Sequence, residues 1–113
     1  MELAVGQLAR QADVKISTLH FYEQHGLIYA RRSFGNQRRF EQSTLKRLSA
    51  IKIAQKFGMS LDEIKQALSC LPLKEEPTKK HWQEFASRWK EDLDNRIELM
   101  IEMRNELSSF TSK

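Results

Sequence analysis

The most restrictive feature of this sequence is a C-terminal stretch, from about Lys79 to Phe110, that contains neither proline nor glycine. Nine residues recur along it at spacings of four and three, and eight of them are apolar. They are Trp82, Ala86, Trp89, Leu93, Arg96, Met100, Met103, Leu107 and Phe110. This spacing predicts one long helix with a coiled-coil seam. The 29 residues from Trp82 to Phe110 would extend roughly 43 Å.

Such a helix is too long to bury its apolar face on a small domain. The chain has 113 residues, of which 40% are hydrophobic and 30% charged, so its own core is small. We therefore expect a homodimer in which this helix packs on its copy. The contact residues would be Trp82, Trp89, Leu93, Met100, Met103 and Leu107, with Arg96 setting register. Packing of the helix on its own chain is the alternative.

The first 26 residues predict two short helices joined by a tight turn, which is the helix-turn-helix pattern. Residues 4–12 place apolar side chains at helical spacing. Asp13 lies in the turn, where it tolerates a left-handed backbone. The second helix would begin at Ser17 as N-cap and end at Gly26 as C′ residue.

This second helix has few apolar residues and is rich in hydrogen-bonding and aromatic groups. We expect it to contact DNA with an outward-facing set of side chains. The set comprises Thr18, His20, Phe21, Tyr22 and Gln24. Leu19 is assigned to the core, and core packing remains an alternative for Phe21 and Tyr22.

A β-hairpin is predicted after this helix. Residues 27–30 and 39–40 are strand-like, and Gly35-Asn36 is a turn-favouring pair between them. Four arginines fall within nine residues: Arg31, Arg32, Arg38 and Arg39. Since arginine forms bidentate contacts with phosphate, a basic hairpin beside a helix-turn-helix indicates a DNA-binding wing.

Two further helices and a connector complete the N-terminal part. One helix spans residues 43–57, ends at Gly58 and carries Lys46, Arg47, Lys52 and Lys56. The next opens with Ser60 and Glu63, spaced as a capping box. Residues 70–78 include two prolines and read as a connector.

Charge and cysteine content narrow the function. Residues 1–58 hold ten Lys and Arg against four Asp and Glu, whereas residues 59–113 hold nine against eleven. A polyanion partner is therefore expected for the first half only. Cys70 is the sole cysteine, which excludes an intrachain disulfide and a cysteine-based metal site. With no long apolar run and no signal-peptide pattern, we expect a cytoplasmic protein without a membrane span.

Taken together, these elements resemble the MerR family of transcription regulators. Residues 17–28 read STLHFYEQHGLI, residues 35–40 read GNQRRF, and residues 58–64 read GMSLDEI. Each run fits a family motif, and the resemblance covers nearly the whole chain. Within the family the chain looks most like the redox-sensing SoxR type. The further matches are IKIAQ at 51–55, Leu71-Pro72, Trp82 and the run WKEDLDNRI at 89–97.

The resemblance implies a dimer that binds a palindromic promoter, distorts the DNA and lets RNA polymerase engage it. Thr18, His20 and Phe21 would face base edges or sugars, with Ser17 and Tyr22 nearer phosphate. Arg38 and Arg39 would hold the flanking backbone, with Lys15, Lys46 and Lys52 as further phosphate candidates.

SoxR-type proteins carry a [2Fe-2S] cluster on four cysteines just after the long helix. Here the sequence reads SSFTSK at residues 108–113, so we expect no cofactor in this chain. A shortened form, a natural truncation and a relative that lost the sensor all remain open. DNA binding should persist, and redox-dependent activation should be lost.

The sequence thus predicts a mostly α fold: a winged helix-turn-helix domain plus a long dimerisation helix in an antiparallel coiled coil. The expected boundaries are residues 1–70 for the DNA-binding domain, 71–79 for the connector, 80–110 for the dimerisation helix and 111–113 for a tail. A MerR-type regulator of a small-molecule effector and a coiled-coil module with incidental DNA binding are the alternatives. No catalytic grouping or phosphate-binding loop is present, so an enzyme is not expected.

Overall fold

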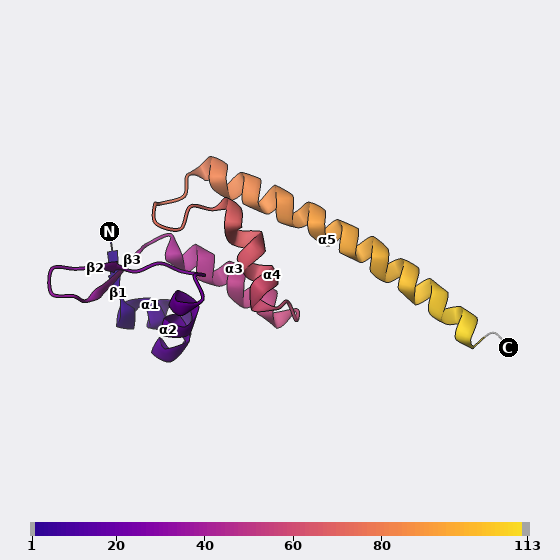
Figure 1. Cartoon of the computed structure of the whole chain (residues 1–113), viewed down its shortest axis with the longest axis horizontal. Helices are drawn as coiled ribbons and strands as arrows, with labels where there is room; N and C mark the ends of the chain where they lie inside the picture. The colour runs from indigo at the N-terminus through magenta and orange to yellow at the C-terminus, as the bar shows by residue number, and fades with distance from the viewer. Residues whose placement is uncertain (1, 112–113) are drawn as a thin grey trace.

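The computed structural model describes residues 2–111, so part of the predicted tail, residues 112–113, lies outside the described residues. Five helices and a small sheet follow one another along the chain (Figure 1). The helices are α1 (Val5–Ala12), α2 (Ile16–Gln24), α3 (Thr44–Lys56), α4 (Leu61–Ala67) and α5 (Lys79–Leu107). Single 3₁₀ turns follow α4 and α5, at Leu68–Cys70 and Ser108–Phe110. The mostly helical fold predicted from the sequence is confirmed.

The wing is an antiparallel sheet in the order β1-β3-β2, with β1 at Glu2–Ala4, β2 at Arg31–Arg32 and β3 at Arg38–Glu41. Leu3 pairs with Phe40, which joins the start of the chain to the hairpin. The three-residue strand β1 was not anticipated, because it is too short to show an alternating pattern.

The predicted strand at residues 27–30 is wrong. Leu27 and Ile28 are both buried, at 1% and 2% exposure, although adjacent side chains on a strand point to opposite faces. They follow Gly26, whose φ of +73° ends α2 as predicted, and the Leu27 N–H donates to the Tyr22 carbonyl at 2.9 Å. The segment therefore fills the core beneath α2, and the hairpin begins later, at Arg31.

Helices α1 and α2 form the expected helix-turn-helix, and Leu8 and Leu19 are fully buried within it. Asp13 adopts a φ of 55° in the turn, as its residue type allows. The predicted N-cap at Ser17 is wrong. Helix α2 begins earlier, and Lys15 occupies the N-cap position without a side-chain cap. The amides of Thr18 and Leu19 already donate to the Lys15 carbonyl at 3.0 and 3.2 Å.

Helices α3 and α4 supply the rest of the core, with Leu48, Ile51 and Ile64 fully buried. The capping box at Ser60 is confirmed: its hydroxyl accepts from the Glu63 amide at 3.2 Å, and the Glu63 carboxylate accepts from the Ser60 amide at 3.1 Å. The apolar face of α3 is only partly used, since Ile53 and Phe57 are largely exposed.

One basic residue of α3 is internal. Arg47 is 8% exposed, and its Nε donates to the Leu27 carbonyl at 2.6 Å while Nη1 lies 3.5 Å from the Pro72 carbonyl. Burial lowers the pKa of Arg47. These bonds tie the segment that follows α2 to the connector that leads to α5.

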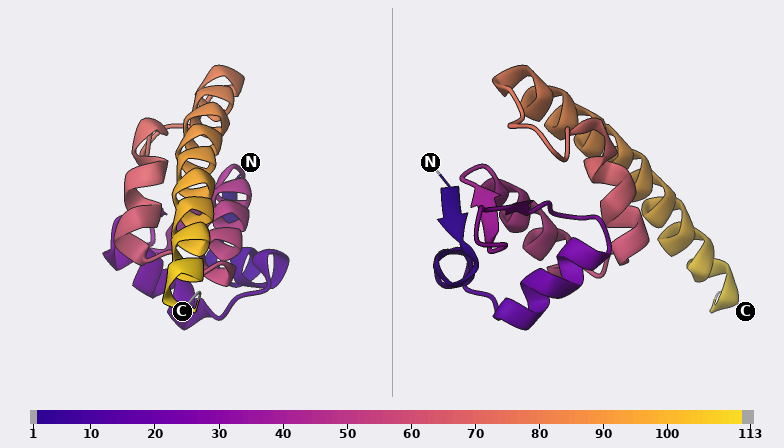
Figure 2. Two further views of the ribbon diagram at one scale, coloured as in Figure 1. Left: turned by 90° about the vertical axis from the view of Figure 1, so that its right-hand side faces the viewer. Right: turned by 60° about the vertical axis from the view of Figure 1, so that its left-hand side comes forward.

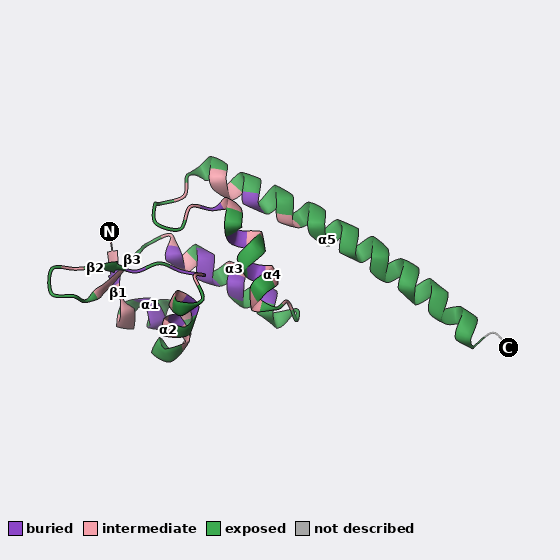
Figure 3. Cartoon of the chain, viewed as in Figure 1, coloured by how far each residue is buried: buried purple, intermediate pink, exposed green. Residues whose placement is uncertain are grey.

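Helix α5 starts against the N-terminal part and then leaves it. Thr78 caps it by accepting from the His81 amide at 3.2 Å. Phe85 is buried, and its ring lies 5.7 Å from Trp82 and 5.3 Å from Trp89. From residue 90 to residue 111 every side chain is exposed (Figure 3). Because this part of α5 projects from the rest, the chain measures 70 × 30 × 20 Å along its principal axes (Figure 2).

The start of the predicted seam is thus used within the chain. Trp82 and Trp89 pack on the core of their own subunit, and Arg96 forms an ion pair with Glu63 of α4. No helix among the described residues is long and apolar enough to cross a bilayer.

Candidate nucleic-acid interface

The outer face of α2 carries most of the predicted contact residues. Ser17 and Gln24 are exposed, Phe21 is 43% exposed, and Thr18 and His20 are half-buried. The Phe21 ring lies 4.3 Å from the imidazole of His25, one turn later, which holds both rings on the surface. The face thus combines hydroxyl, imidazole, amide and aromatic groups, which can meet base edges and sugars in a groove.

Tyr22 does not belong to this face, so the prediction that it points outward is wrong. The residue is 4% exposed, and its hydroxyl donates to Oε1 of Gln55 on α3 at 2.5 Å. Burial raises the pKa of Tyr22, which keeps the phenol neutral near pH 7. Its ring packs between α2 and α3, the core alternative that the sequence left open.

The N-terminus of α2 is open to an anion. Its cap residue, Lys15, provides no side-chain hydrogen bond and is exposed. The amides of the first helical turn carry partial positive charge, and an ammonium at the same end adds to it. A phosphate at this end would thus meet both groups.

The other two lysines predicted to contact phosphate are engaged inside the chain. Lys46 Nζ lies 4.6 Å from the centre of the Trp82 ring, in a cation–π contact with α5. Lys52 Nζ donates to the Ala12 carbonyl at 2.8 Å and lies 3.4 Å from that of Asp13, which satisfies the C-terminal end of α1. These contacts favour structural roles for both, which could not be read from local sequence.

The wing presents a well-defined turn. The Ser33 amide donates to the Gln37 carbonyl at 2.8 Å, and the Asn36 amide donates to the Ser33 carbonyl at 2.9 Å. The turn predicted at the Gly-Asn pair is present, and Asn36 takes a φ of 61°, a left-handed conformation that asparagine tolerates. Phe34 is fully exposed at the tip.

The four wing arginines have different partners. Arg31 Nε donates to Glu2 of β1 at 2.8 Å, and this bond lowers the pKa of the Glu2 carboxyl. Arg38 Nε donates to Glu23 Oε1 at 2.6 Å, whereas Arg39 contacts the Gln37 amide oxygen at 3.2 Å. Arg32 is exposed and has no carboxylate partner among residues 2–111. Arg32 and Arg39 are therefore the two wing arginines that form no ion pair with a carboxylate among residues 2–111.

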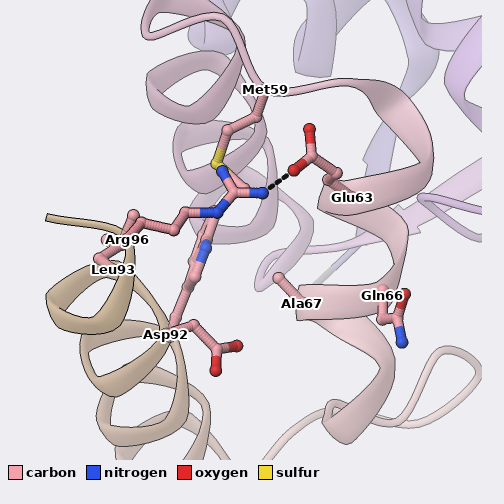
Figure 4. Close-up of a pocket in the computed structure, with 8 residues that line it drawn as sticks. Met59, Glu63, Gln66, Ala67, Asp92, Leu93 and Arg96 are labelled. Carbon is pink, nitrogen blue, oxygen red and sulfur yellow. Dashed lines mark hydrogen bonds and ion pairs between the residues drawn. The ribbon is translucent and has the colours of Figure 1, made fainter. Parts of the chain in front are cut away.

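A hollow lies between α4 and α5 (Figure 4). Its volume is about 330 Å³. Met59, Ala67, Trp89 and Leu93 form apolar parts of its lining, and the Glu63–Arg96 ion pair crosses it. Figure 4 shows the two charged side chains reaching toward each other from the two helices.

The side chains do not fit an iron–sulfur cluster. Cys70, the one cysteine of the sequence, is half-buried with its Sγ 3.9 Å from the Ala67 carbonyl oxygen. A [2Fe-2S] cluster of the SoxR type needs four thiolates. No group of three or more His, Cys, Asp and Glu that could hold a metal occurs in the described part of the chain.

Two family descriptions match this arrangement of elements. Residues 3–70 match "MerR HTH family regulatory protein", and residues 45–110 match "MerR, DNA binding". The chain belongs to the MerR family. It is therefore a DNA-binding transcription regulator, as the resemblance of its α2 and wing motifs predicted.

Individual MerR-family relatives agree with this assignment. The chain is 37% identical over 107 residues to an HTH-type transcriptional activator SoxR homolog of Chromobacterium violaceum, covering 95% of this chain and 72% of that protein. It is 36% identical over 67 residues to the mercuric resistance operon regulatory protein of Pseudomonas fluorescens. That match covers 58% of this chain and 46% of the relative, so the chain spans about half the length of the mercuric resistance regulators.

Solved MerR-family structures share the fold. HiNmlR, a MerR family regulator lacking the sensor domain and bound to promoter DNA, superposes with a TM-score of 0.62 at 25% identity, over 96% of this chain and 80% of that one. PbrR691 from Ralstonia metallidurans, in complex with lead(II), gives a TM-score of 0.57 at 26% identity, over 95% and 84%. The predicted winged helix-turn-helix with a long C-terminal helix is confirmed.

Proposed function

We propose that this MerR-family chain acts as a SoxR-type homodimer that binds a palindromic promoter and distorts it so that RNA polymerase can engage it. The observation that carries the proposal is the joint surface of α2 and the wing. Ser17, Thr18, His20 and Phe21 form a mixed polar and aromatic face, and the Arg38–Glu23 bond holds the wing beside it. The 37% identity to a SoxR homolog supports the SoxR type.

Charged and base-reading groups have separate tasks in this proposal. Lys15 and the open end of α2 meet one phosphate, while Arg32 and Arg39 hold the flanking backbone. Thr18, His20 and Phe21 reach base edges and sugars from the same helix. A two-fold dimer repeats this set on the second half-site.

We expect Lys15→Ala and Arg32→Ala to weaken binding to every duplex and to lower the salt slope by about one each. His20→Ala should instead reduce the preference for the promoter duplex over a scrambled one, by roughly 5- to 100-fold. The measurement is fluorescence anisotropy at several salt concentrations, with a duplex selected from random-sequence DNA as the promoter probe.

Lys46→Ala is the matched control, because its ammonium lies over the Trp82 ring. It should leave the salt slope unchanged. Equal loss on promoter and scrambled duplexes with His20→Ala would contradict the assignment of base contacts to α2.

The hollow between α4 and α5 favours a second candidate, a MerR-type regulator that responds to a small-molecule effector. Its 330 Å³ is at the small end of the range for ligand pockets, and it combines apolar walls with a few polar groups. Trp89 lines it and can report binding by fluorescence. Saturable quenching by an added small molecule that is lost in Ala67→Phe, which fills the hollow without adding a tryptophan, together with altered promoter affinity, would support this candidate. Identical quenching in both proteins would dismiss it.

A further inference from the structure

The wing and the recognition helix α2 are joined by one ion pair. Arg38 is the first residue of β3, and Glu23 lies in the last turn of α2. Nε of Arg38 donates to Oε1 of Glu23 at 2.6 Å, and the two side chains are only 30% and 22% exposed. Among residues 2–111, no other hydrogen bond connects α2 with the wing strands. This contact is therefore the direct polar link between the two DNA-facing elements, in addition to the packing of both on α1.

The position of Glu23 is unusual for a DNA-binding surface. A carboxylate on the recognition helix repels the phosphates that the neighbouring lysine and arginines attract. Arg38 neutralises it, but the charge of Arg38 is then not available as a full charge for phosphate. The pair as a whole contributes almost no net attraction to DNA, so electrostatic binding alone gives no reason for either residue.

We propose that Glu23 and Arg38 form a strut that fixes the wing at the angle at which Arg32 and Arg39 meet the DNA backbone while α2 occupies the groove. Glu23 is then a positioning residue for DNA binding, and Arg38 acts through it. This inference rests on the proposed function. The gain is preorganisation: a wing already held in the bound geometry loses less conformational freedom on binding.

The strut and a direct phosphate contact predict opposite signs for one substitution. If Arg38 binds phosphate, Glu23→Ala removes a repulsive charge and releases the guanidinium, so promoter affinity rises. If the pair is a strut, Glu23→Ala lowers promoter affinity, by about tenfold for a coupled pair. Glu23→Gln keeps an oxygen that can accept from Arg38, so its affinity should fall between those of the wild type and Glu23→Ala.

The test is a double-mutant cycle on the full chain, with Glu23→Ala, Arg38→Ala and the double variant. Promoter affinity is measured over a series of salt concentrations. The strut predicts that both single variants lose affinity to a similar degree and that the double variant is no worse than either. Hydroxyl-radical footprinting should then show weaker protection at the flanks, where the wing lies, with unchanged protection where α2 lies.

Two results would overturn the strut. One is an affinity of Glu23→Ala equal to or above that of the wild type. The other is a drop of about one in the salt slope of Arg38→Ala alone, which identifies a phosphate contact. Thermal melting checks that each variant is folded, and Glu23→Gln replaces Glu23→Ala if the latter is not. A wild-type chain without preference for the promoter duplex would instead overturn the proposed function itself.

Discussion

Replacing Ile97 with glutamate is expected to separate the proposed dimer into monomers and to lower its affinity for a palindromic promoter by at least about 100-fold. Beyond the part of α5 that packs on its own chain, an apolar stripe is left uncovered. It consists of Leu93, Ile97, Met100 and Ile101, which are 40–71% exposed. Their spacing of four, three and one places them on one side of the helix.

This stripe shares Leu93 and Met100 with the seam that the sequence predicted, and it adds Ile97 and Ile101. The structure engages Trp82, Trp89 and Arg96 within one subunit, which leaves the neighbouring face for a second copy. Each apolar side chain that becomes buried contributes about 1.5–3 kcal/mol, and a two-fold axis applies each substitution twice. A glutamate in the contact adds the cost of burying an unpaired charge.

The affinity falls because a monomer holds one half-site only. Once one α2 of a dimer is bound, the second α2 is held close to its half-site at a high effective concentration. This gain in affinity disappears when the dimer dissociates. Analytical ultracentrifugation gives the oligomeric state, and anisotropy on the palindrome gives the affinity.

Asn95→Glu is the matched control for this prediction. It introduces the same charge two residues earlier, on the opposite side of α5, and Asn95 is exposed. It should leave both the dimer and the promoter affinity unchanged. An Ile97→Glu chain that remains dimeric would show that the stripe is not the contact between subunits.

Phe40→Ala is expected to lower the free energy of unfolding by about 3–5 kcal/mol, a large share of the total for a domain of this size. Phe40 is completely buried in β3 and pairs with Leu3 of β1. Removing the ring takes away the transfer and packing free energy of a fully buried side chain. It also leaves a cavity at the base of the wing. The measurement is urea denaturation followed by circular dichroism.

Phe34→Ala provides the same chemical change at the tip of the same hairpin, where the ring is fully exposed. Surface substitutions of this kind alter stability by no more than about 0.5 kcal/mol. If both variants lost the same stability, burial would not explain the effect at Phe40. DNA affinity measured on the folded fraction separates loss of the wing from loss of the whole domain.

Local sequence patterns determined the order and type of the helices. Gly26 and Gly58 end helices with positive φ, Ser60 and Glu63 cap α4, and the Gly35-Asn36 pair turns the wing. Each of these signals acts between residues close in sequence, so it survives in any tertiary arrangement. The family motifs lie on the same segments, which is why the fold and the DNA-binding role were predictable.

The tertiary structure decided whether tyrosine, arginine and lysine side chains contact other parts of the chain or remain available to DNA. Tyr22 could face DNA or the core, and its bond to Gln55 on α3 selected the core. Arg38, Lys46 and Lys52 could each meet phosphate, yet each found an acceptor or a ring on another element. Such partners lie 15 to 40 residues away in the chain, so no local pattern shows them.

Helix α5 shows both what local sequence determines and what depends on tertiary packing. Its length and apolar character follow from the absence of proline and glycine and from helical spacing. Which face serves its own subunit depends on where α3 and α4 place their side chains: Phe85 is buried there, and Arg96 pairs with Glu63. The sequence alone determined that this helix must bury an apolar face, whereas only the packing of the domain decided which part of that face remains for another chain.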